Sequence, residues 1–306
     1  MIALGIDTSN YATSLALVEG ESSKIILARK QFLPVKPGEK GLRQQDAVFR
    51  HIKNLTDIMS EIKGMDIGVV GVSVRPSDDP DSYMPCFLAG KMSAYSIARR
   101  LNIPVAETSH QNGHLAAAIF GAEDDSFYNK DFIFCHVSGG TTDILYINNG
   151  EAKEKIGSSL DLFAGQAVDR LGVKLGYPFP AGKYVSELAA GCDEDIKVTP
   201  SVKGTYCNLS GLENICDKLL KEGKTPQYTA KSCLTYIGAS LLKMIENAPD
   251  KYKNLPVIMA GGVMSSDYLK DFISQNIKNV KFVPPLLSSD NRIGVAIKAY
   301  RKVKYG

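Results

Sequence analysis

The sequence predicts a duplicated α/β fold made of two lobes. Each half of the chain opens with the same pattern of an apolar strand, a small polar turn and a returning strand, at residues 2–18 and again at residues 132–147. Helices and further apolar strands follow each hairpin, which is typical of an α/β architecture. We expect the two turns, 7–12 and 138–142, to face each other across a cleft between the lobes.

The first lobe is assigned to residues 1–104. Its expected elements alternate between apolar strands and helices with apolar residues at helical spacing: strands at 2–6, 13–18, 67–74 and 103–106, and helices at 42–63 and 86–101. Just beyond this lobe, Ser109 is a suitable N-cap for a further helix that ends near Gly121. Gly113 inside that helix costs roughly 1 kcal/mol relative to alanine, which indicates that another group approaches closely there.

The second lobe is assigned to residues 105–306. Strands are expected at 132–137, 143–147, 256–259 and 280–283, and helices at about 162–176, 183–190, 211–222, 229–247 and 290–302. One alternative stays open, namely that the last helix packs back on the first lobe. A chain of 306 residues is long enough for one large domain or two of ordinary size.

Composition and charge exclude several classes of protein. The six cysteines are scattered without a C-x-x-C pair, which favours reduced thiols in the cytoplasm over a disulfide framework or a zinc ribbon. No apolar run approaches the length that spans a membrane, and Asp7 comes too early for a signal peptide. The net charge of +3 is compatible with nucleic-acid binding but does not argue for it.

Three small-residue turns that follow expected strands could bring backbone N–H groups onto phosphate oxygens. They are Asp7-Thr8-Ser9-Asn10, Ser138-Gly139-Gly140-Thr141-Thr142 and Ala260-Gly261-Gly262-Val263-Met264-Ser265-Ser266. One Gly-Gly turn is weak support for a phosphate site. Three in the order hairpin, hairpin and strand-to-helix turn match the actin-like and sugar-kinase ATPase fold, in which two hairpins hold the phosphates and the third turn lies by the nucleoside.

A His-x-x-x-His pair, His110 and His114, places two imidazoles on one face of the expected helix. This spacing lets both rings reach one metal ion. His136 directly precedes the second turn. The alternative for an isolated pair is two ordinary surface or half-buried histidines.

Over nearly its whole length the chain resembles the catalytic subunit family of tRNA N6-adenosine threonylcarbamoyltransferase, formerly called glycoprotease or O-sialoglycoprotein endopeptidase. The resemblance rests on motifs in one order: Gly5-Ile6-Asp7-Thr8-Ser9, His110-Gln-Asn-Gly-His114-Leu115, Val137-Ser138-Gly139-Gly140-Thr141-Thr142, the run from Leu160 to Asp169, the run from Leu175 to Gly182, Leu209-Ser210-Gly211-Leu212, Ala260-Gly261-Gly262-Val263 and Ser289-Asp290-Asn291. The run from Leu175 contains Phe179-Pro180-Ala181.

The resemblance implies one iron or zinc ion held by His110, His114 and Asp290. Some family members add a tyrosine directly before the Val-Ser-Gly-Gly turn, and here His136 occupies that position. Imidazole nitrogens with a carboxylate suit zinc or ferrous iron better than magnesium. In the family the metal bridges to the phosphate of the bound adenine nucleotide or acyl-adenylate.

The resemblance also assigns the nucleotide contacts. Ser138, Gly139 and Gly140 would line the phosphate, with Thr141 next to them, while Gly261, Gly262 and Ser266 form the third turn. Asp169 and Gly182 would hold the ribose and base, because an ionised carboxylate accepts two hydrogen bonds. The alternative for Asp169 is a solvated helix residue paired with Arg170 or Lys174.

Several positions depart from the family pattern. Tyr11 and Ala12 replace an acidic pair, and Asn112 replaces the glutamate between the two histidines. Thr141 stands for a histidine, Ser266 for an asparagine and Glu213 for a lysine, and residues 75–83 replace a Gly-Pro-Gly loop. The chain therefore resembles a divergent paralogue, in which the transfer reaction is less secure than nucleotide binding.

The favoured function is metal-dependent transfer of a threonylcarbamoyl group from threonylcarbamoyl-AMP to N6 of a tRNA adenosine, with tRNA and the subunits of a threonylcarbamoyl-transfer complex as partners. Phe49, His51 and Ile52 lie in an expected amphipathic helix whose apolar face is predicted to be core. The resemblance implies, as an alternative, a dimer with a partner through the first-lobe helices. Two alternatives stay open: a carbamoyl transferase or nucleotide hydrolase with another acceptor, and a non-catalytic nucleotide-binding subunit.

Overall fold

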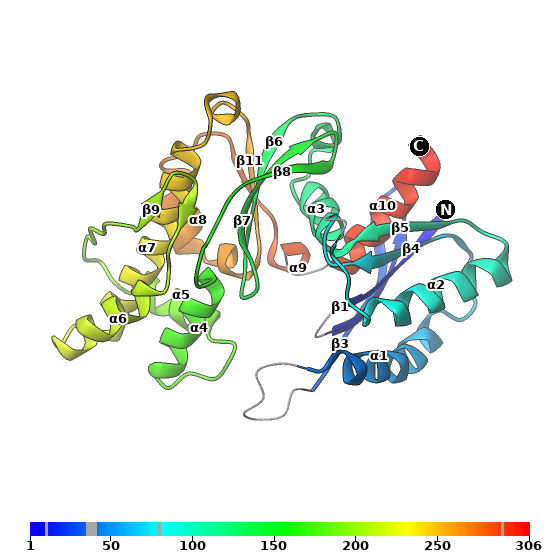
Figure 1. Cartoon of the computed structure of the whole chain (residues 1–306), viewed down its shortest axis with the longest axis horizontal. Coiled ribbons are helices and arrows are strands. Elements are labelled where there is room, and N and C mark those ends of the chain that lie inside the picture. The colour runs from blue at the N-terminus through cyan, green and yellow to red at the C-terminus, as the bar shows by residue number, and fades with distance from the viewer. Residues whose placement is uncertain (10–11, 35–41, 79–80, 289–290) are drawn as a thin grey trace. The chain divides into compact units, whose positions relative to one another are not determined.

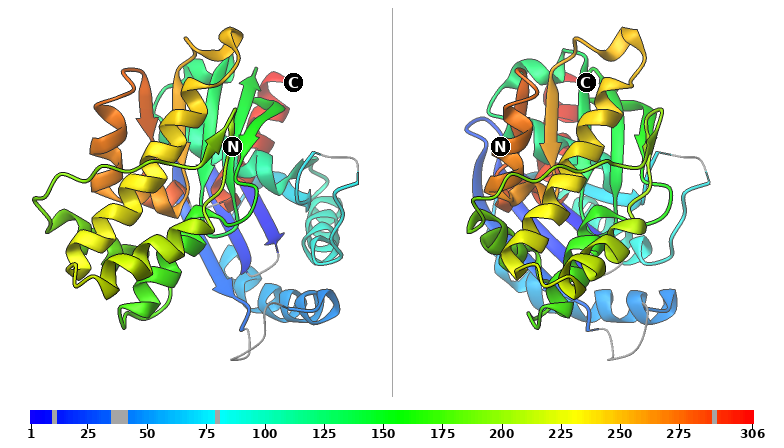
Figure 2. Two further views of the ribbon diagram at one scale, coloured as in Figure 1. Left: turned by 60° about the vertical axis from the view of Figure 1, so that its left-hand side comes forward. Right: turned by 90° about the vertical axis from the view of Figure 1, so that its left-hand side faces the viewer.

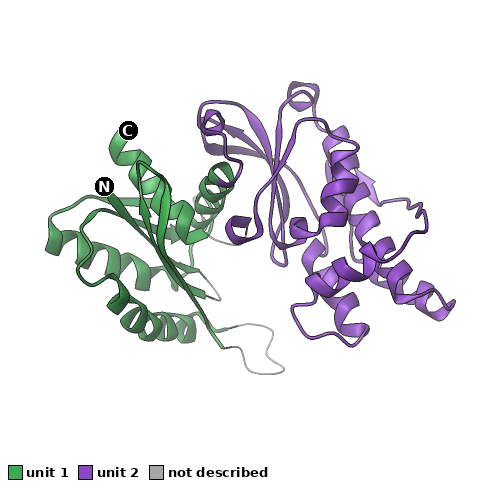
Figure 3. Cartoon of the chain, turned by 180° about the vertical axis from the view of Figure 1, so that it is seen from behind, with its two compact units in different colours: residues 1–120, 290–306 green, residues 121–289 purple. Residues whose placement is uncertain are grey.

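The computed structural model describes residues 1–9, 12–34, 42–78, 81–288 and 291–306. They divide into two compact units, residues 1–120 with 290–306 and residues 121–289 (Figure 3). The sequence interpretation ends the first lobe at residue 104, whereas here residues 105–120 group with the first unit. The reason is that β5 (Val105–Ser109) is a parallel neighbour of β4 (Ile67–Arg75) in the first sheet.

The first unit is built on a sheet with the strand order β3-β2-β1-β4-β5. Strands β1 (Ile2–Ser9), β2 (Ala12–Glu19) and β3 (Lys24–Phe32) form an antiparallel meander, and β4 and β5 continue the sheet in parallel with β1. The helices of this unit are α1 (Gln44–Ile58), α2 (Phe87–Leu101), α3 (His110–Gly121) and α10 (Asn291–Tyr305), with a 3-10 turn at Met59–Ile62 (Figure 1).

Strand β1 separates two different layers. Its buried leucine and isoleucine, Leu4 and Ile6, belong to the apolar core that α1 and α2 cover. On the other face Gly5 lets α10 approach, since a Cβ there would lie 2.3 Å from the carbonyl oxygen of Arg292. Because side chains alternate between the faces of a strand, Asp7 shares the α10 face with Gly5.

The second unit repeats the same sheet, with the strand order β12-β11-β6-β7-β8. Strands β6 (Phe132–Val137), β7 (Thr142–Asn148) and β8 (Glu151–Ser158) form the antiparallel meander, while β11 (Val257–Ala260) and β12 (Val280–Phe282) continue it in parallel. Both sheets thus run from a three-stranded meander into two parallel strands, and the duplication predicted from the sequence is confirmed.

Helices cover the second sheet through one large apolar core. They are α4 (Ala164–Lys174), α5 (Gly182–Ala190), α6 (Gly211–Lys221), α7 (Pro226–Glu246) and α8 (Asp267–Ser274). Figure 2 shows α7 in the middle of this layer, where it packs against the other four. The short elements are β9 (Val202–Lys203), β10 (Tyr206–Cys207), α9 (Pro285–Ser288) and 3-10 turns at Asp125–Tyr128, Asp250–Tyr252 and Gly262–Ser265.

Strands β3 and β8 and helix α8 were not expected from the sequence. Both strands end their sheets, and their exposed residues are rich in lysine, arginine and glutamate, as edge strands often are. Such segments lack the apolar alternation on which a strand prediction rests. Among the described residues, no helix combines the length and the apolar character needed to cross a membrane.

Candidate functional site

The two histidines of the His-x-x-x-His pair meet on one face of α3. His110 is the first residue of the helix and His114 lies one turn further on. Their Nε2 atoms are 3.2 Å apart, and the ring centroids are separated by 4.6 Å with the rings nearly perpendicular. Two unprotonated nitrogens at this separation are spaced as adjacent ligands of one metal ion, because metal–imidazole bonds are about 2.0–2.1 Å long.

A buried carboxylate supports the first histidine from behind. Asp7, near the end of β1, is only 2% exposed, and its Oδ1 lies 3.1 Å from Nδ1 of His110. Ser73 of β4 donates to the same oxygen, and Ser9 donates to Oδ2 at 2.7 Å. Burial pushes the pKa of Asp7 up, but the neighbouring His110 ring and the hydroxyls of Ser73 and Ser9 together hold it well below its usual range.

Asn291 reaches the same histidine from the C-terminal helix. Its side-chain amide lies 2.7 Å from Nδ1 of His110, although 181 residues separate the two positions. The approach is possible because residue 113 is a glycine, where a Cβ would lie 1.7 Å from Asn291 Oδ1. The close approach that Gly113 predicted is therefore that of Asn291 and α10.

The other two expected metal ligands are placed less directly. Asp290 lies outside the described residues, and His136 belongs to β6 of the second unit. Within the described part of the chain, no group of three or more histidine, cysteine, aspartate or glutamate side chains is arranged to hold a metal. The pair on α3 fits a metal ion by its converging nitrogens and by the carboxylate behind His110, which is the usual partner of a metal-binding histidine.

The turn after β6 is open to an incoming ligand. A Cβ on Gly139 or Gly140 would touch no atom within 4 Å. The turn is closed by the Ser138 N–H, which donates to the Thr141 carbonyl at 2.7 Å. Behind it, Gly165 at the start of α4 packs so tightly that a Cβ there would lie 2.5 Å from the Gly139 nitrogen. The two glycines are exposed beside a helix N-terminus, and the Gly140 N–H donates to Ser138 Oγ at 3.3 Å, a long bond that a phosphate oxygen could replace.

The third predicted turn lies beside the second. Gly261, directly after β11, has φ of 107°, and a Cβ on it would lie 2.1 Å from the carbonyl oxygen of Val137. Only glycine accepts both the conformation and the contact. Gly262 is open to solvent, whereas Ser266 is 7% exposed and uses its hydroxyl to cap α8 and to accept a hydrogen bond from Ser186.

Asp169 of α4 points at the start of α5 rather than at a lysine or arginine. Its Oδ1 accepts a hydrogen bond of 2.7 Å from the Ala181 N–H, beside Gly182. Burial raises the pKa of Asp169, against the effect of the hydrogen bonds from Ala181 and Gly182. The expected ribose carboxylate is therefore held at the N-terminus of α5, where it has a structural task of its own.

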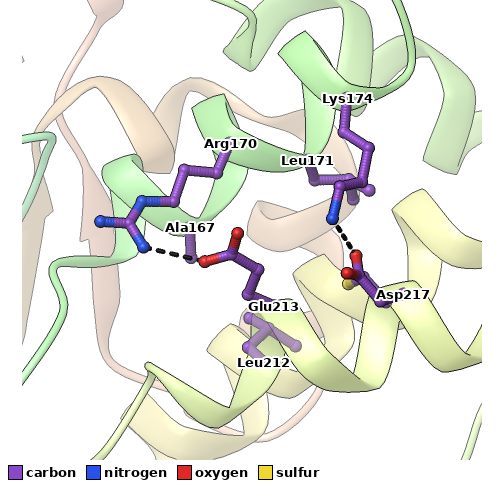
Figure 4. Close-up of a pocket in the computed structure, with 8 residues that line it drawn as sticks. Ala167, Arg170, Leu171, Lys174, Leu212, Glu213 and Asp217 are labelled. Carbon is purple, nitrogen blue, oxygen red and sulfur yellow. Dashed lines mark hydrogen bonds and ion pairs between the residues drawn. The ribbon is translucent and has the colours of Figure 1, made fainter.

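The ion pairs that were an alternative for Asp169 go elsewhere (Figure 4). Arg170 Nη1 lies 2.8 Å from Glu213 Oε2, and Lys174 pairs with Asp217, so both bridges join α4 to α6. They fill the crevice between the two helices, which leaves a cavity of about 10 Å³. This is room for one water at most. Glu213, one of the departures from the family pattern, is thus an ion-pair partner.

A second departure is also engaged in a contact. Asn112 is 5% exposed and its amide donates to the Asp78 carboxylate, while the Gln111 N–H donates to the Pro76 carbonyl at 3.0 Å. These bonds fasten the loop that follows β4 to the first turn of α3. Residues two apart on a helix point to different faces, so Asn112 does not share the face of the histidines.

Sequence reasoning did not assign a role to Asp7 or Asn291 in the histidine site. Both lie inside motifs that carry the family resemblance, Gly5-Ile6-Asp7 and Asp290-Asn291, and that position was the only available signal. Cys135, next to His136, is fully buried, and burial raises the pKa of its thiol to about 12. A thiol of this kind is a structural residue rather than a nucleophile.

A sequence profile of the tRNA N6-adenosine threonylcarbamoyltransferase family matches residues 78–297. Curated relatives of that name include a protein of Thermodesulfovibrio yellowstonii, 29% identical over 100% of this chain and 96% of its own length, and one of Methanopyrus kandleri, 24% identical over 97% and 86%. A probable bifunctional tRNA threonylcarbamoyladenosine biosynthesis protein of Thermoplasma volcanium is 25% identical over 90% of this chain and 50% of its own.

Solved structures show the same fold. The activator of 2-hydroxyisocaproyl-CoA dehydratase from Clostridium difficile superposes with a TM-score of 0.59, at 14% identity over 99% of this chain and 96% of its own. A ROK family glucokinase from Streptomyces griseus gives 0.57 at 13% identity, over 98% and 100%. The predicted actin-like and sugar-kinase fold is thereby confirmed, and at these identities the likeness speaks for the fold alone.

Proposed function

The chain belongs to the tRNA N6-adenosine threonylcarbamoyltransferase family, and from this premise we propose its reaction. We propose that it transfers a threonylcarbamoyl group from threonylcarbamoyl-AMP to N6 of a tRNA adenosine. The observation that carries the proposal is the pair of converging imidazoles of His110 and His114, backed by the Asp7 carboxylate. A subunit that only binds nucleotide has no need of this arrangement, so we favour an enzyme over a non-catalytic partner.

The turn after β6 is the proposed phosphate site. The open backbone at Gly139 and Gly140 can donate to the phosphate of the adenylate, and the start of α4 adds the positive end of a helix dipole. Asp169 and Gly182 are the proposed contacts for ribose and base. Asp169 retains lone pairs for hydroxyl groups beyond those that the Ala181 and Gly182 N–H groups use.

His110 and His114 are the proposed ligands of one iron or zinc ion, with His136 and Asp290 as further ligands. When bound, such an ion supplies a Lewis acid at the acyl-phosphate. In the transfer, the adenosine N6 lone pair forms a bond to the carbamoyl carbon, the bond from that carbon to the phosphate oxygen breaks, AMP leaves and N6 loses a proton. No nucleophilic serine or cysteine of the protein is needed.

An exposed apolar face on the first unit is the proposed interface of a transfer complex. Two residues of α1, Phe49 and Ile52, are 70% and 46% exposed, and two of α2, Leu88 and Met92, are 50% and 59% exposed. Helices α1 and α2 pack side by side, so the four side chains lie on neighbouring helices. Clusters of exposed apolar residues mark protein interfaces, and we propose that α1 and α2 form a helical dimer. We also propose a cytoplasmic location, which a tRNA substrate and the scattered cysteines both favour.

A second function, transfer to a different acceptor, is favoured by the first turn. Ala12 replaces an acidic residue of the family, begins β2 and is 7% exposed. Because alanine has no carboxylate, this position lacks the acidic group that family members have there. The two functions are separated by AMP release from threonylcarbamoyl-AMP. Release that rises with added tRNA and leaves the modified base in the RNA supports tRNA as acceptor. Equal release without tRNA contradicts it.

A further inference from the structure

The side-chain amide of Asn291 and the carboxylate of Asp7 compete for one nitrogen of His110. Nδ1 lies 3.1 Å from Asp7 Oδ1 and 2.7 Å from the Asn291 amide. An ionised carboxylate can only accept hydrogen bonds, and Asp7 already accepts from the hydroxyls of Ser73 and Ser9. For the contact with Asp7 to be a hydrogen bond, Nδ1 must therefore carry a proton.

A protonated Nδ1 also decides which way the Asn291 amide points. If its NH₂ group faced Nδ1, two donors would meet at 2.7 Å. In that orientation the buried Oδ1 has no hydrogen-bond partner among the residues that the structure describes. The oxygen and nitrogen of an amide are distinguished only by their hydrogen bonds. Turning the amide over places the Oδ1 acceptor on the Nδ1–H, so that a donor meets an acceptor at this contact.

We propose that Asp7 and Asn291 act together as positioning residues that hold His110 in the Nδ1–H tautomer and leave its Nε2 unprotonated. That nitrogen is the one that faces Nε2 of His114 at 3.2 Å. With a lone pair on Nε2, His110 is ready to bind a cation as soon as one arrives. The proposal rests on the proposed function only in naming iron or zinc as the cation. The tautomer of His110 is expected in the protein without any metal bound.

The geometry explains why both partners are needed. Asp7 supplies charge, and it is fixed by two serine hydroxyls on β1 and β4. Asn291 supplies a second acceptor from α10, so the ring is held from two elements and cannot rotate about its bond to Cβ without losing one of them. A carboxylate or carbonyl behind a metal-binding histidine fixes ring orientation and raises the basicity of the ligand nitrogen.

The test is two-bond ¹H–¹⁵N correlation NMR of the full-length, metal-free protein at pH 8, with a chelator present. The chain has four histidines, and His51 serves as the internal control because it lies in α1 and hydrogen-bonds to Thr13 instead. We expect the Nδ1–H pattern for His110 in the wild type. A dominant Nε2–H pattern, or a doubly protonated ring, overturns the proposal without any variant.

The variant Asp7→Leu removes the carboxylate and keeps the number and branching of the side-chain heavy atoms, and we expect the Nε2–H tautomer of His110 to appear. Zinc affinity, measured by competition with a chromophoric chelator, should fall about 10–100-fold. Asp57→Leu is the matched control, because it makes the same substitution at an exposed position of α1. It should keep both the tautomer and the affinity. Unchanged values in Asp7→Leu overturn the proposal.

If Asp7→Leu fails to fold, Asp7→Asn carries the zinc measurement, with several-fold weaker binding expected from the lost charge and unchanged affinity counting against the proposal. The outcome is independent of the reaction. A protein that shows the expected tautomers but does not modify tRNA contradicts the proposed function alone, and an active enzyme with His110 in the other tautomer contradicts only the positioning role.

Discussion

Gly113 and Gly294 face each other where α3 crosses α10, and a Cβ on Gly294 would lie 1.9 Å from the carbonyl oxygen of Gly113. Two glycines at one crossing let the backbones of the helices come into direct contact. Because α10 begins at Asn291, one turn before Gly294, this contact also fixes where the amide of Asn291 meets the ring of His110. The helix crossing therefore determines the position of Asn291 relative to His110.

Substitution of Gly113 by alanine should destabilise the helix crossing and weaken metal binding at the histidine site. Its Cβ would lie 1.7 Å from Asn291 Oδ1 and 2.9 Å from a methyl group of Val295, so we expect a loss of about 1–3 kcal/mol in the free energy of unfolding and weaker zinc binding. Chemical denaturation and metal titration measure the two effects. Gly211→Ala, in a helical position with open space around it, is the control and should be neutral or slightly stabilising. Equal behaviour of the two variants would show that the crossing tolerates a methyl group.

The turn after β6 makes a different prediction, because its glycines have space in the free protein. Gly140→Val should leave the melting temperature nearly unchanged, since nothing lies within 4 Å of its Cβ position. The same side chain would cover the backbone N–H groups that we assign to phosphate, so AMP binding should weaken at least about tenfold, or about 1.4 kcal/mol. Calorimetric titration with AMP gives this value. Gly191→Ala at the end of α5 is a control that should bind AMP normally, and tight binding by Gly140→Val would move the phosphate site elsewhere.

The sequence predicted the two hairpins and the turns after β1, β6 and β11 because small-residue turns after short apolar strands are a local signal. It could not predict that Asp7, His110 and Asn291 meet, since the three residues are about a hundred or more positions apart and no local pattern links them. For Asp169 the motif was visible, but its contact with Ala181 depends on how α4 and α5 pack. Polar edge strands such as β8 lack a signal of their own.

The buried His51 makes the stability of the first unit depend on pH. Its side chain is fully buried and Nδ1 lies 2.8 Å from the Thr13 hydroxyl. Burial lowers the pKa of His51 to about 4, against a smaller upward effect of Asp7. Between about pH 6.5 and pH 4 the unfolded chain takes up a proton that the folded protein does not. Stability should therefore fall as the pH drops through this window, by roughly 3 kcal/mol.

Comparison with His51→Gln isolates this effect from the other histidines. Glutamine can still hydrogen-bond to Thr13 but does not titrate, so the free energy of unfolding of the variant should change less between pH 7 and pH 4.5. Denaturant titrations at several pH values measure the slope. The lowered pKa of Asp7 acts in a separate range, because it costs stability only as the pH falls below the value of about 3.9 for an unfolded aspartate. Parallel pH profiles of wild type and variant would contradict the assignment to His51.

The apolar face of α1 and α2 should decide the state of association. Phe49 and Met92 are 70% and 59% exposed, so the double variant Phe49→Glu/Met92→Glu removes little buried area within the chain and should melt close to the wild type. Sedimentation velocity at micromolar concentrations should show a dimer for the wild type and a monomer for the variant, because two buried carboxylates per protomer would oppose the contact. Leu160→Glu, at a site 62% exposed in the second unit, controls for added charge and should leave the dimer intact. A wild-type chain that sediments as a monomer at every concentration would rule out pairing between copies of this chain through these helices.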